Sequence, residues 1–253
     1  MANGGVFARR PAEFGRVTTF PNTSCGLDRA VWRALSGPHR HLGVVSARCA
    51  AYHADVSPFA AFASPPNERD WAALAALVGA DRELAFTPDQ MLPPPAWIVE
   101  EVGHGYQMID EQRISTPVAP AVGTVHDLGT TDVDDIFALH QVARPGPFER
   151  RTIAFGDYRG IRIDGALVAM AGTRMRFDGW TEISALATHP SFRGRGLGEV
   201  LLRDVSARIR RRGEQPFLHV AAENPAIRLY EKLGFRIRRE TRFTFVRTPS
   251  AEP

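Results

Sequence analysis

Apolar side chains recur at helical spacing in two segments of the first half of the chain. Residues 28–36 place them on one helical face, and Gly37 ends the pattern. A second helix is predicted after Asn67, whose side chain can cap it together with Asp70, and Gly79 fits its C-terminal end. Both segments are therefore predicted to be amphipathic helices.

Short apolar runs between and after these helices predict three strands, at residues 42–54, 83–87 and 96–102. The first half of the chain is thus itself α plus β. Residues 115–123 (STPVAPAVG) are rich in proline and small residues and lack an apolar period, which is typical of a stiff connector. We expect a domain boundary there, with an N-terminal α/β domain at 1–118 and a second domain at 119–253.

The second half opens with a helix, which Thr131 is predicted to cap and Pro145 to end. Three strands are predicted next, at residues 158–163, 166–176 and 180–188. Asp164-Gly165 and Asp178-Gly179 separate them, and an Asp-Gly pair between apolar runs favours a type I′ turn, which needs positive φ at both central positions. The segment therefore predicts an antiparallel meander.

Beyond residue 190 the pattern alternates between helix and strand. It predicts a helix at about 196–212, a strand at 216–221, a helix at 225–233 and a strand pair around 235–246. Helices that alternate with strands after a meander indicate a mixed, mostly antiparallel sheet with helices on its faces. The predicted fold class is therefore α/β (α+β).

The composition is that of an ordinary globular protein, with 44% hydrophobic and 23% charged residues among 253. No apolar run reaches the roughly 18 residues of a membrane helix, and the first thirty residues lack the apolar stretch of a signal peptide. We therefore expect a cytoplasmic protein without a membrane partner. A net charge of +3 is low for a nucleic-acid binder, and the arginines at 208–212 suit a helix C-terminus, so no nucleic-acid partner is expected.

The two cysteines, Cys25 and Cys49, are too few for a disulfide framework and lack CxxC spacing. Each is expected to be a buried free thiol. His39 and His41 have no accompanying residues at a recognisable ligand spacing, so no metal is expected.

The segment from His189 to Gly198 (HPSFRGRGLG) lies between a predicted strand and a predicted helix. A glycine-rich turn that opens a helix directs several backbone N–H groups the same way, and the helix dipole adds positive potential, so the turn suits a pyrophosphate. Arg193 and Arg195 add full charges. The glycine spacing is that of neither a dinucleotide fold nor a P-loop. Packing alone could also explain such a turn.

Two motifs resemble those of the GCN5-related N-acetyltransferases. Arg193-x-x-Gly196-x-Gly198 is similar to that family's R/Q-x-x-G-x-G/A signature, and residues 225–235 (PAIRLYEKLGF) resemble its second signature. The resemblance covers about residues 124–247 and is nearest to the FR47-like branch. It implies the fold of that family and acetyl-coenzyme A as cosubstrate. The N-terminal domain could be a degenerate copy of the same fold.

The resemblance also implies which residues contact the cosubstrate. The pyrophosphate would be bound by the loop and first helical turn, formed by Arg193, Gly194, Arg195, Gly196, Leu197, Gly198 and Glu199. Leu186, Ala187 and Thr188 would offer main-chain groups to the pantetheine arm, at the point where the two central strands part. Asn224 resembles a cofactor-contacting asparagine, although it lies six residues before Tyr230 where seven are expected.

Acyl transfer from a thioester to an amine needs a neutral nucleophile, oxyanion stabilisation and a proton for the thiolate. By the resemblance Tyr230 is the candidate acid, and Glu182, 11 residues before Arg193, is the candidate base, its pKa raised by partial burial. Tyr230 could instead pack on the sheet, and Glu182 could face solvent. His219 and His189 are alternative bases.

The sequence thus predicts an N-acetyltransferase that moves an acetyl group from acetyl-coenzyme A to a primary amine by direct attack in a ternary complex. The expected acceptor is a small-molecule or peptide amine, and two copies of the chain could form a homodimer. The alternative is a non-catalytic module that binds or senses acyl-coenzyme A.

Overall fold

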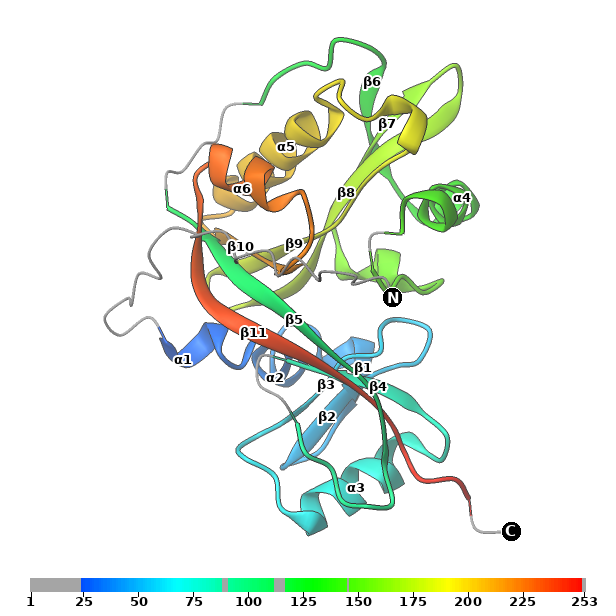
Figure 1. Ribbon diagram of the computed structural model, residues 1–253, viewed down its shortest axis with the longest axis vertical. Helices are drawn as coiled ribbons and strands as arrows, with labels where there is room; N and C mark the ends of the chain where they lie inside the picture. Colours follow the sequence, from blue (N-terminus) through cyan, green and yellow to red (C-terminus); the bar gives the residue numbers. More distant parts are fainter. Residues whose placement is uncertain (1–23, 88–90, 112–116, 145, 252–253) are drawn as a thin grey trace, which may run out of the picture.

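A computed structural model of the chain describes residues 24–87, 91–111, 117–144 and 146–251 (Figure 1). The α-helices are α1 (Ser24–Leu27), α2 (Ala30–Ser36), α3 (Glu68–Val78), α4 (Val133–Ala143), α5 (Leu197–Arg211) and α6 (Ile227–Lys232). Strands before residue 118 are β1 (Gly43–Val45), β2 (Cys49–Tyr52), β3 (Ala60–Phe62), β4 (Glu83–Phe86) and β5 (Ile98–Asp110). Later strands are β6 (Thr124–Leu128), β7 (Tyr158–Ile163), β8 (Ala166–Phe177), β9 (Trp180–Thr188), β10 (Gln215–Ala221) and β11 (Phe235–Arg247).

Short-range patterns predicted most of these elements correctly. Helix α3 begins after the predicted capping box, in which the Asn67 side chain accepts from the N–H of Asp70 and the Asp70 carboxylate accepts from the N–H of Asn67. Both predicted Asp-Gly turns have positive φ at their two central residues, 49° and 83° in the first and 43° and 79° in the second. The β7–β8–β9 meander is therefore confirmed.

Three local predictions were wrong. Residues 42–54 form the hairpin of β1 and β2, because the chain turns at Ser46. Helix α4 begins at Val133 after a 3₁₀ turn that includes Thr131, and the Asp132 carboxylate accepts from the backbone N–H of Gly129. Residues 235–247 form the one long strand β11, whose two register shifts let it follow a twisted partner.

The partner of β11 comes from the first half of the chain. Strand order in the large sheet is β4-β11-β5-β10-β9-β8-β7-β6, and every adjacent pair is antiparallel except β9 and β10, which are parallel. Strand β5 lies between β10 and β11, and β4 lies at the edge (Figure 1). The mixed, mostly antiparallel fold is thus confirmed. The boundary at residue 118 stays a prediction, and the large sheet is continuous across it.

Helices cover both faces of this sheet. Figure 1 shows α5 and α6 on one side of the strands and α4 on the other. Helix α5 buries Leu201, Val205 and Ile209 against β8 and β9, whereas α2 packs between β8 and the small sheet β1-β2-β3. A separate aromatic cluster around Trp71 anchors α3 to β4. Packed elements thus bury both faces of the large sheet.

Cys49 is buried and has a free thiol, as predicted, whereas the side chain of Cys25 lies outside the described part. Among the described residues, no group of three or more His, Cys, Asp or Glu side chains could hold a metal ion. No helix in the same ranges combines the length and apolar character that crossing a membrane requires.

Candidate active site

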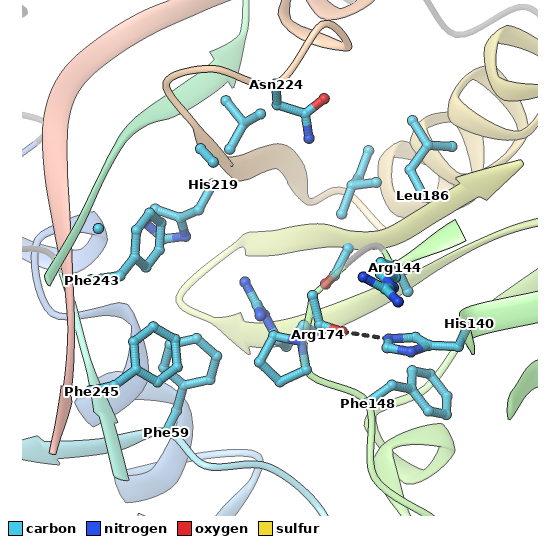
Figure 2. Close-up of a pocket in the computed structure, with 18 of the residues that line it drawn as sticks. Phe59, His140, Arg144, Phe148, Arg174, Leu186, His219, Asn224, Phe243 and Phe245 are labelled. Carbon is cyan, nitrogen blue, oxygen red and sulfur yellow. Dashed lines mark hydrogen bonds between the residues drawn. The ribbon is translucent and has the colours of Figure 1, made fainter. Parts of the chain in front are cut away.

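The two parallel strands at the centre of the sheet separate and open a cavity. Pairing between β9 and β10 runs from Trp180 with Gln215 to Glu182 with Phe217. Beyond that point the strands line a cavity of about 420 Å³ (Figure 2). Its lining comprises Phe59, Gly103, His104, His140, Arg144, Gly146, Pro147, Phe148, Arg174, Ile183, Ser184, Ala185, Leu186, His219, Val220, Ala221, Asn224, Tyr230, Phe243 and Phe245.

A bulge in β9 shapes the wall of this cavity. Two residues, Ala185 and Leu186, oppose a single residue of β8, and Ala185 has a φ of +52°. A positive φ at a non-glycine residue is uncommon and costs free energy, so the surrounding sheet must impose it. Ala187 and Thr188 then pair with β8 on one side. Because β10 has moved away, their other strand edge is open for a ligand's hydrogen bonds.

The glycine loop leads from the end of β9 into α5. Gly194 and Gly196 have φ values of +76° and +75°, which glycine adopts without strain. The first N–H groups of α5, those of Leu197, Gly198 and Glu199, have no acceptor within the helix. Arg193 donates to the carbonyl of Thr188, and the Arg195 guanidinium lies 4.9 Å from the Phe192 ring centroid. The loop therefore concentrates amides and positive charge at one helix N-terminus.

Glu199 and Asn224, two other predicted cosubstrate contacts, form side-chain hydrogen bonds within the protein. The Glu199 carboxylate accepts from Lys232 (2.7 Å) and Arg203 (2.9 Å), and these bonds lower the pKa of Glu199. Glu199 thereby ties α5 to α6. Asn224 Oδ1 accepts from the backbone N–H of Ala226, which leaves the amide nitrogen on the cavity lining.

Glu182, in the last residue pair that joins β9 to β10, forms a buried ion pair behind the cavity lining. Its side chain has 0% exposure, and Arg174 donates to both oxygens, from Nη2 to Oε1 (2.6 Å) and from Nε to Oε2 (2.9 Å). Burial by itself raises the pKa of Glu182, but Arg174 and His219 outweigh it and hold that pKa well below its usual range. The expected rise in pKa was wrong, because sequence reasoning missed Arg174.

His219 is held between Glu182 and Gln107. Its Nδ1 lies 2.8 Å from Glu182 Oε1, and its Nε2 lies 3.1 Å from Gln107 Nε2. Gln107 Nε2 also donates to the carbonyl of Leu27, while Gln107 Oε1 accepts from Arg238. Because these bonds make the Gln107 amide nitrogen a donor, the hydrogen-bond pattern has His219 accepting at Nε2 and donating from Nδ1 to Glu182.

Tyr230 approaches the same cavity from α6. It is 8% exposed and lines the cavity, and the tilted ring of Phe235 packs beside it. Burial raises the pKa of Tyr230 to about 12, so the phenol stays protonated at neutral pH. His189, in contrast, accepts from the N–H of Ser191 at the loop and is absent from the cavity lining.

Several site residues carry no sequence motif. Arg174 faces Glu182 from the neighbouring strand, and Phe59 reaches the cavity from the loop before β3. His140 lies at the end of α4 and donates from Nε2 to the carbonyl of Gly146. The sequence clue to these residues was Arg174, a charged residue in a mostly apolar strand. The basic run at residues 208–212 lies outside this site. Its side chains form ion pairs, such as Arg208 with Asp127 and Arg212 with Glu214.

The mixed sheet, its parting central strands and the glycine loop before α5 define the acetyltransferase fold that the two signatures implied. A family model described as FR47-like protein matches residues 158–244. A solved protein of Novosphingobium aromaticivorans, described as an acetyltransferase of the GNAT family, is 39% identical with a TM-score of 0.80, over 90% of this chain and 100% of that one. The chain belongs to the GCN5-related N-acetyltransferase family and is an N-acetyltransferase.

Two further relatives extend the comparison. The [ribosomal protein bS18]-alanine N-acetyltransferase of Salmonella typhimurium is 34% identical over 122 residues, which cover 45% of this chain and 81% of the relative. A GCN5-related N-acetyltransferase from Kribbella flavida shares the fold, with 20% identity and a TM-score of 0.57 over 88% of this chain and 96% of its own. The activity named for the Salmonella relative favours an enzyme over a non-catalytic binding module.

Proposed function

We propose that the chain transfers an acetyl group from acetyl-coenzyme A to a primary amine by direct attack in a ternary complex. The observation that carries this proposal is the cavity between β9 and β10, because a protonated phenol lines it and β9 leads from its wall to the glycine loop. The acetyl transfer itself follows from the family. The amine class, the direct attack and the residue roles belong to the proposal.

The residues present fit acetyl-coenzyme A. The amides of residues 194–199, with Arg193 and Arg195, would hold the pyrophosphate, because they combine unpaired donors with positive charge. The backbone at Gly198 is open to a ligand. A Cβ placed there would lie 3.6 Å from Leu229 Cδ2 and 3.9 Å from Thr188 Oγ1, which are ordinary contact distances. Leu186, Ala187 and Thr188 would hold the pantetheine arm through main-chain groups. The Asn224 amide nitrogen is available as a further donor.

When bound, the cosubstrate supplies an acetyl group activated as a thioester. In the transfer a C–N bond forms, the C–S bond breaks, the amine loses a proton and the sulfur gains one. Tyr230 would donate a hydrogen bond and then its Oη proton to the sulfur. The apolar surroundings that raise the phenol's pKa also raise the basicity of a thiolate beside it, so the two groups stay matched.

The base stays a prediction. Because both oxygens of Glu182 are occupied and the carboxylate is held ionised, its surroundings support an indirect role, in which it fixes Arg174 and the tautomer of His219. The proton of the amine would then leave through water in the cavity, beside His219. The cytoplasmic location and the homodimer also stay predictions.

Calorimetry with acetyl-coenzyme A, combined with a thiol-release assay across a panel of amines, tests the proposal. We expect binding and amine-dependent release of one thiol for each acetylated amine. Binding without release on any amine would favour the non-catalytic alternative. A covalent acetyl-enzyme, detected by mass spectrometry as a competent intermediate, would contradict the direct attack.

Replacing Gly196 by alanine is expected to weaken coenzyme A binding by at least about tenfold, because loss of the loop conformation turns amides away from the phosphates. Gly165→Ala is a matched control, since Gly165 also has positive φ, 83° against 75°, and a Cβ would meet nothing within 4 Å at either glycine. Both variants should lose about 1–2 kcal/mol of stability from backbone strain. Calorimetry should show weaker binding for Gly196→Ala alone; equal affinities would remove the loop from the binding site.

A further inference from the structure

Basic side chains outnumber acidic ones on the described lining of the cavity. Among its described lining residues are two arginines, Arg144 and Arg174, and three histidines, but no aspartate or glutamate. A cavity built for a polyamine or a lysine-rich peptide needs carboxylates, because each ammonium that leaves water must be compensated. The lining therefore favours an acceptor with an anionic group in addition to its amine.

Arg174 offers a fixed donor for such an anion. Glu182 holds its Nε and Nη2, and the guanidinium lies 4.6 Å from the Phe59 ring centroid, so its orientation is set by two independent contacts. None of the described residues is recorded as accepting from Nη1. A preorganised guanidinium N–H group binds a carboxylate with little loss of side-chain freedom.

Arg144 supplies a second cation on the cavity lining. It is exposed, follows the last residue of α4 in a left-handed conformation (φ +48°), and has no ion pair within the described ranges. Figure 2 shows Arg144 beside His140 and Phe148, with Arg174 toward the centre. Unlike Arg174, it carries a charge that no carboxylate in the described part of the chain neutralises.

An aromatic surface lies on the other side of Arg174 from Arg144 (Figure 2). Phe59, Phe243 and Phe245 lie together on the side away from Leu186 (Figure 2). Leu186 and Asn224, at the other end, are the residues assigned above to the cosubstrate. The acceptor end therefore offers aromatic rings on one side of Arg174 and the Arg144 guanidinium on the other, and the small volume of about 420 Å³ must also contain the thioester.

On the basis of the proposed function, we propose that the acceptor is a free α-amino acid with an apolar or aromatic side chain. Its carboxylate binds Arg174 Nη1 and Arg144, its side chain lies on the phenylalanine rings, and its amine faces the thioester. The N-terminus of a polypeptide fits less well, since its first carboxyl group is a neutral amide. Arg144 is thus a specificity-determining residue.

The test compares amines that differ in one group. L-Phenylalanine, L-leucine and L-methionine are assayed with acetyl-coenzyme A beside their carboxamides, with spermidine and an alanine-initiated peptide as further arms. We expect kcat/KM to be at least about tenfold higher for the acids than for the carboxamides, because the carboxamides lose a charge-assisted hydrogen bond. Equal rates for acids and carboxamides, or faster acetylation of spermidine or the peptide, would overturn the inference.

A substitution at Arg144 tests whether this residue causes the preference for acids over carboxamides. Arg144→Gln should reduce the acid-to-carboxamide ratio at least about threefold, mainly through KM for the acid. Arg150→Gln is the matched control, because Arg150 is an exposed arginine outside the cavity lining, and its ratio should not change. An unchanged ratio in Arg144→Gln would overturn the role of Arg144.

The two proposals fail in different ways. Acetylation of carboxamides or spermidine, but of no acid, leaves the proposed function intact and removes the amino-acid inference. Binding of acetyl-coenzyme A without acetylation in any arm contradicts both.

Discussion

Tyr230→Phe is expected to lower kcat by about 10²- to 10⁴-fold, the usual contribution of a positioned general acid. The phenol lines the cavity and, with a pKa of about 12, keeps its proton throughout the assay range, so its removal leaves the departing sulfur without a donor. No described residue is recorded as a hydrogen-bond partner of this hydroxyl. The folded state should therefore lose little stability, and acetyl-coenzyme A affinity should stay near that of the unmodified protein.

Steady-state kinetics and calorimetry on the same preparation check this expectation. Tyr158→Phe is the matched control, because Tyr158 is a buried tyrosine of β7 outside the cavity lining, and its hydroxyl donates to the carbonyl of Thr152. That variant should keep its kcat. If Tyr230→Phe turns over as fast as the control, Tyr230 is not the acid; a parallel loss of cosubstrate affinity would make it a binding residue.

Glu182→Gln is expected to destabilise the protein by about 3–5 kcal/mol, because it leaves the buried Arg174 guanidinium without its counter-charge. The ion pair is enclosed, with side-chain exposures of 0% for Glu182 and 13% for Arg174. Asp134→Asn is the matched control. Asp134 pairs with Arg150 at the surface, where the two side chains are 90% and 69% exposed, so this variant should lose less than about 1 kcal/mol of stability. Urea unfolding of both variants measures the difference.

The same ion pair predicts how stability depends on pH. The pKa of Glu182 is lower in the folded protein than its ordinary value of 4.5, so the carboxylate contributes full stability above about pH 4.5 and loses it as the pH falls toward the folded value. Over that window this group should lower the free energy of unfolding by about 1.4 kcal/mol per pH unit. Glu182→Gln should lack this component, and identical pH slopes in the two proteins would contradict the pairing.

The first half of the chain takes part in the site through the sheet. Strand β5 places Gln107 beside His219 and brings Gly103 and His104 to the cavity wall, while Phe59 packs on Arg174. The N-terminal half thus contributes to the acceptor end, whereas the glycine loop at the other end lies entirely in the second half. A degenerate copy of the acetyltransferase fold in the N-terminal half stays a prediction.

Local features could be predicted from the sequence because their causes lie within a few residues. The capping box at Asn67, the Asp-Gly turns and the glycines before α5 each depend on backbone geometry over a short segment. The family followed from two motifs of the same kind. The proposed cosubstrate end of the site runs along contiguous residues of β9, the loop and α5, so it could be predicted from the sequence and stays a prediction.

The proposed acceptor end depends on contacts between distant segments, which no short-range period encodes. Strand β5 enters between β10 and β11, so the final segment became one long strand instead of the predicted pair. Sheet register brings Arg174 next to Glu182, and that contact reversed the expected direction of the Glu182 pKa. Sequence by itself determined the class of chemistry, whereas tertiary packing decided which charges and rings line the cavity, because strand order in a sheet is set by the burial of the whole chain.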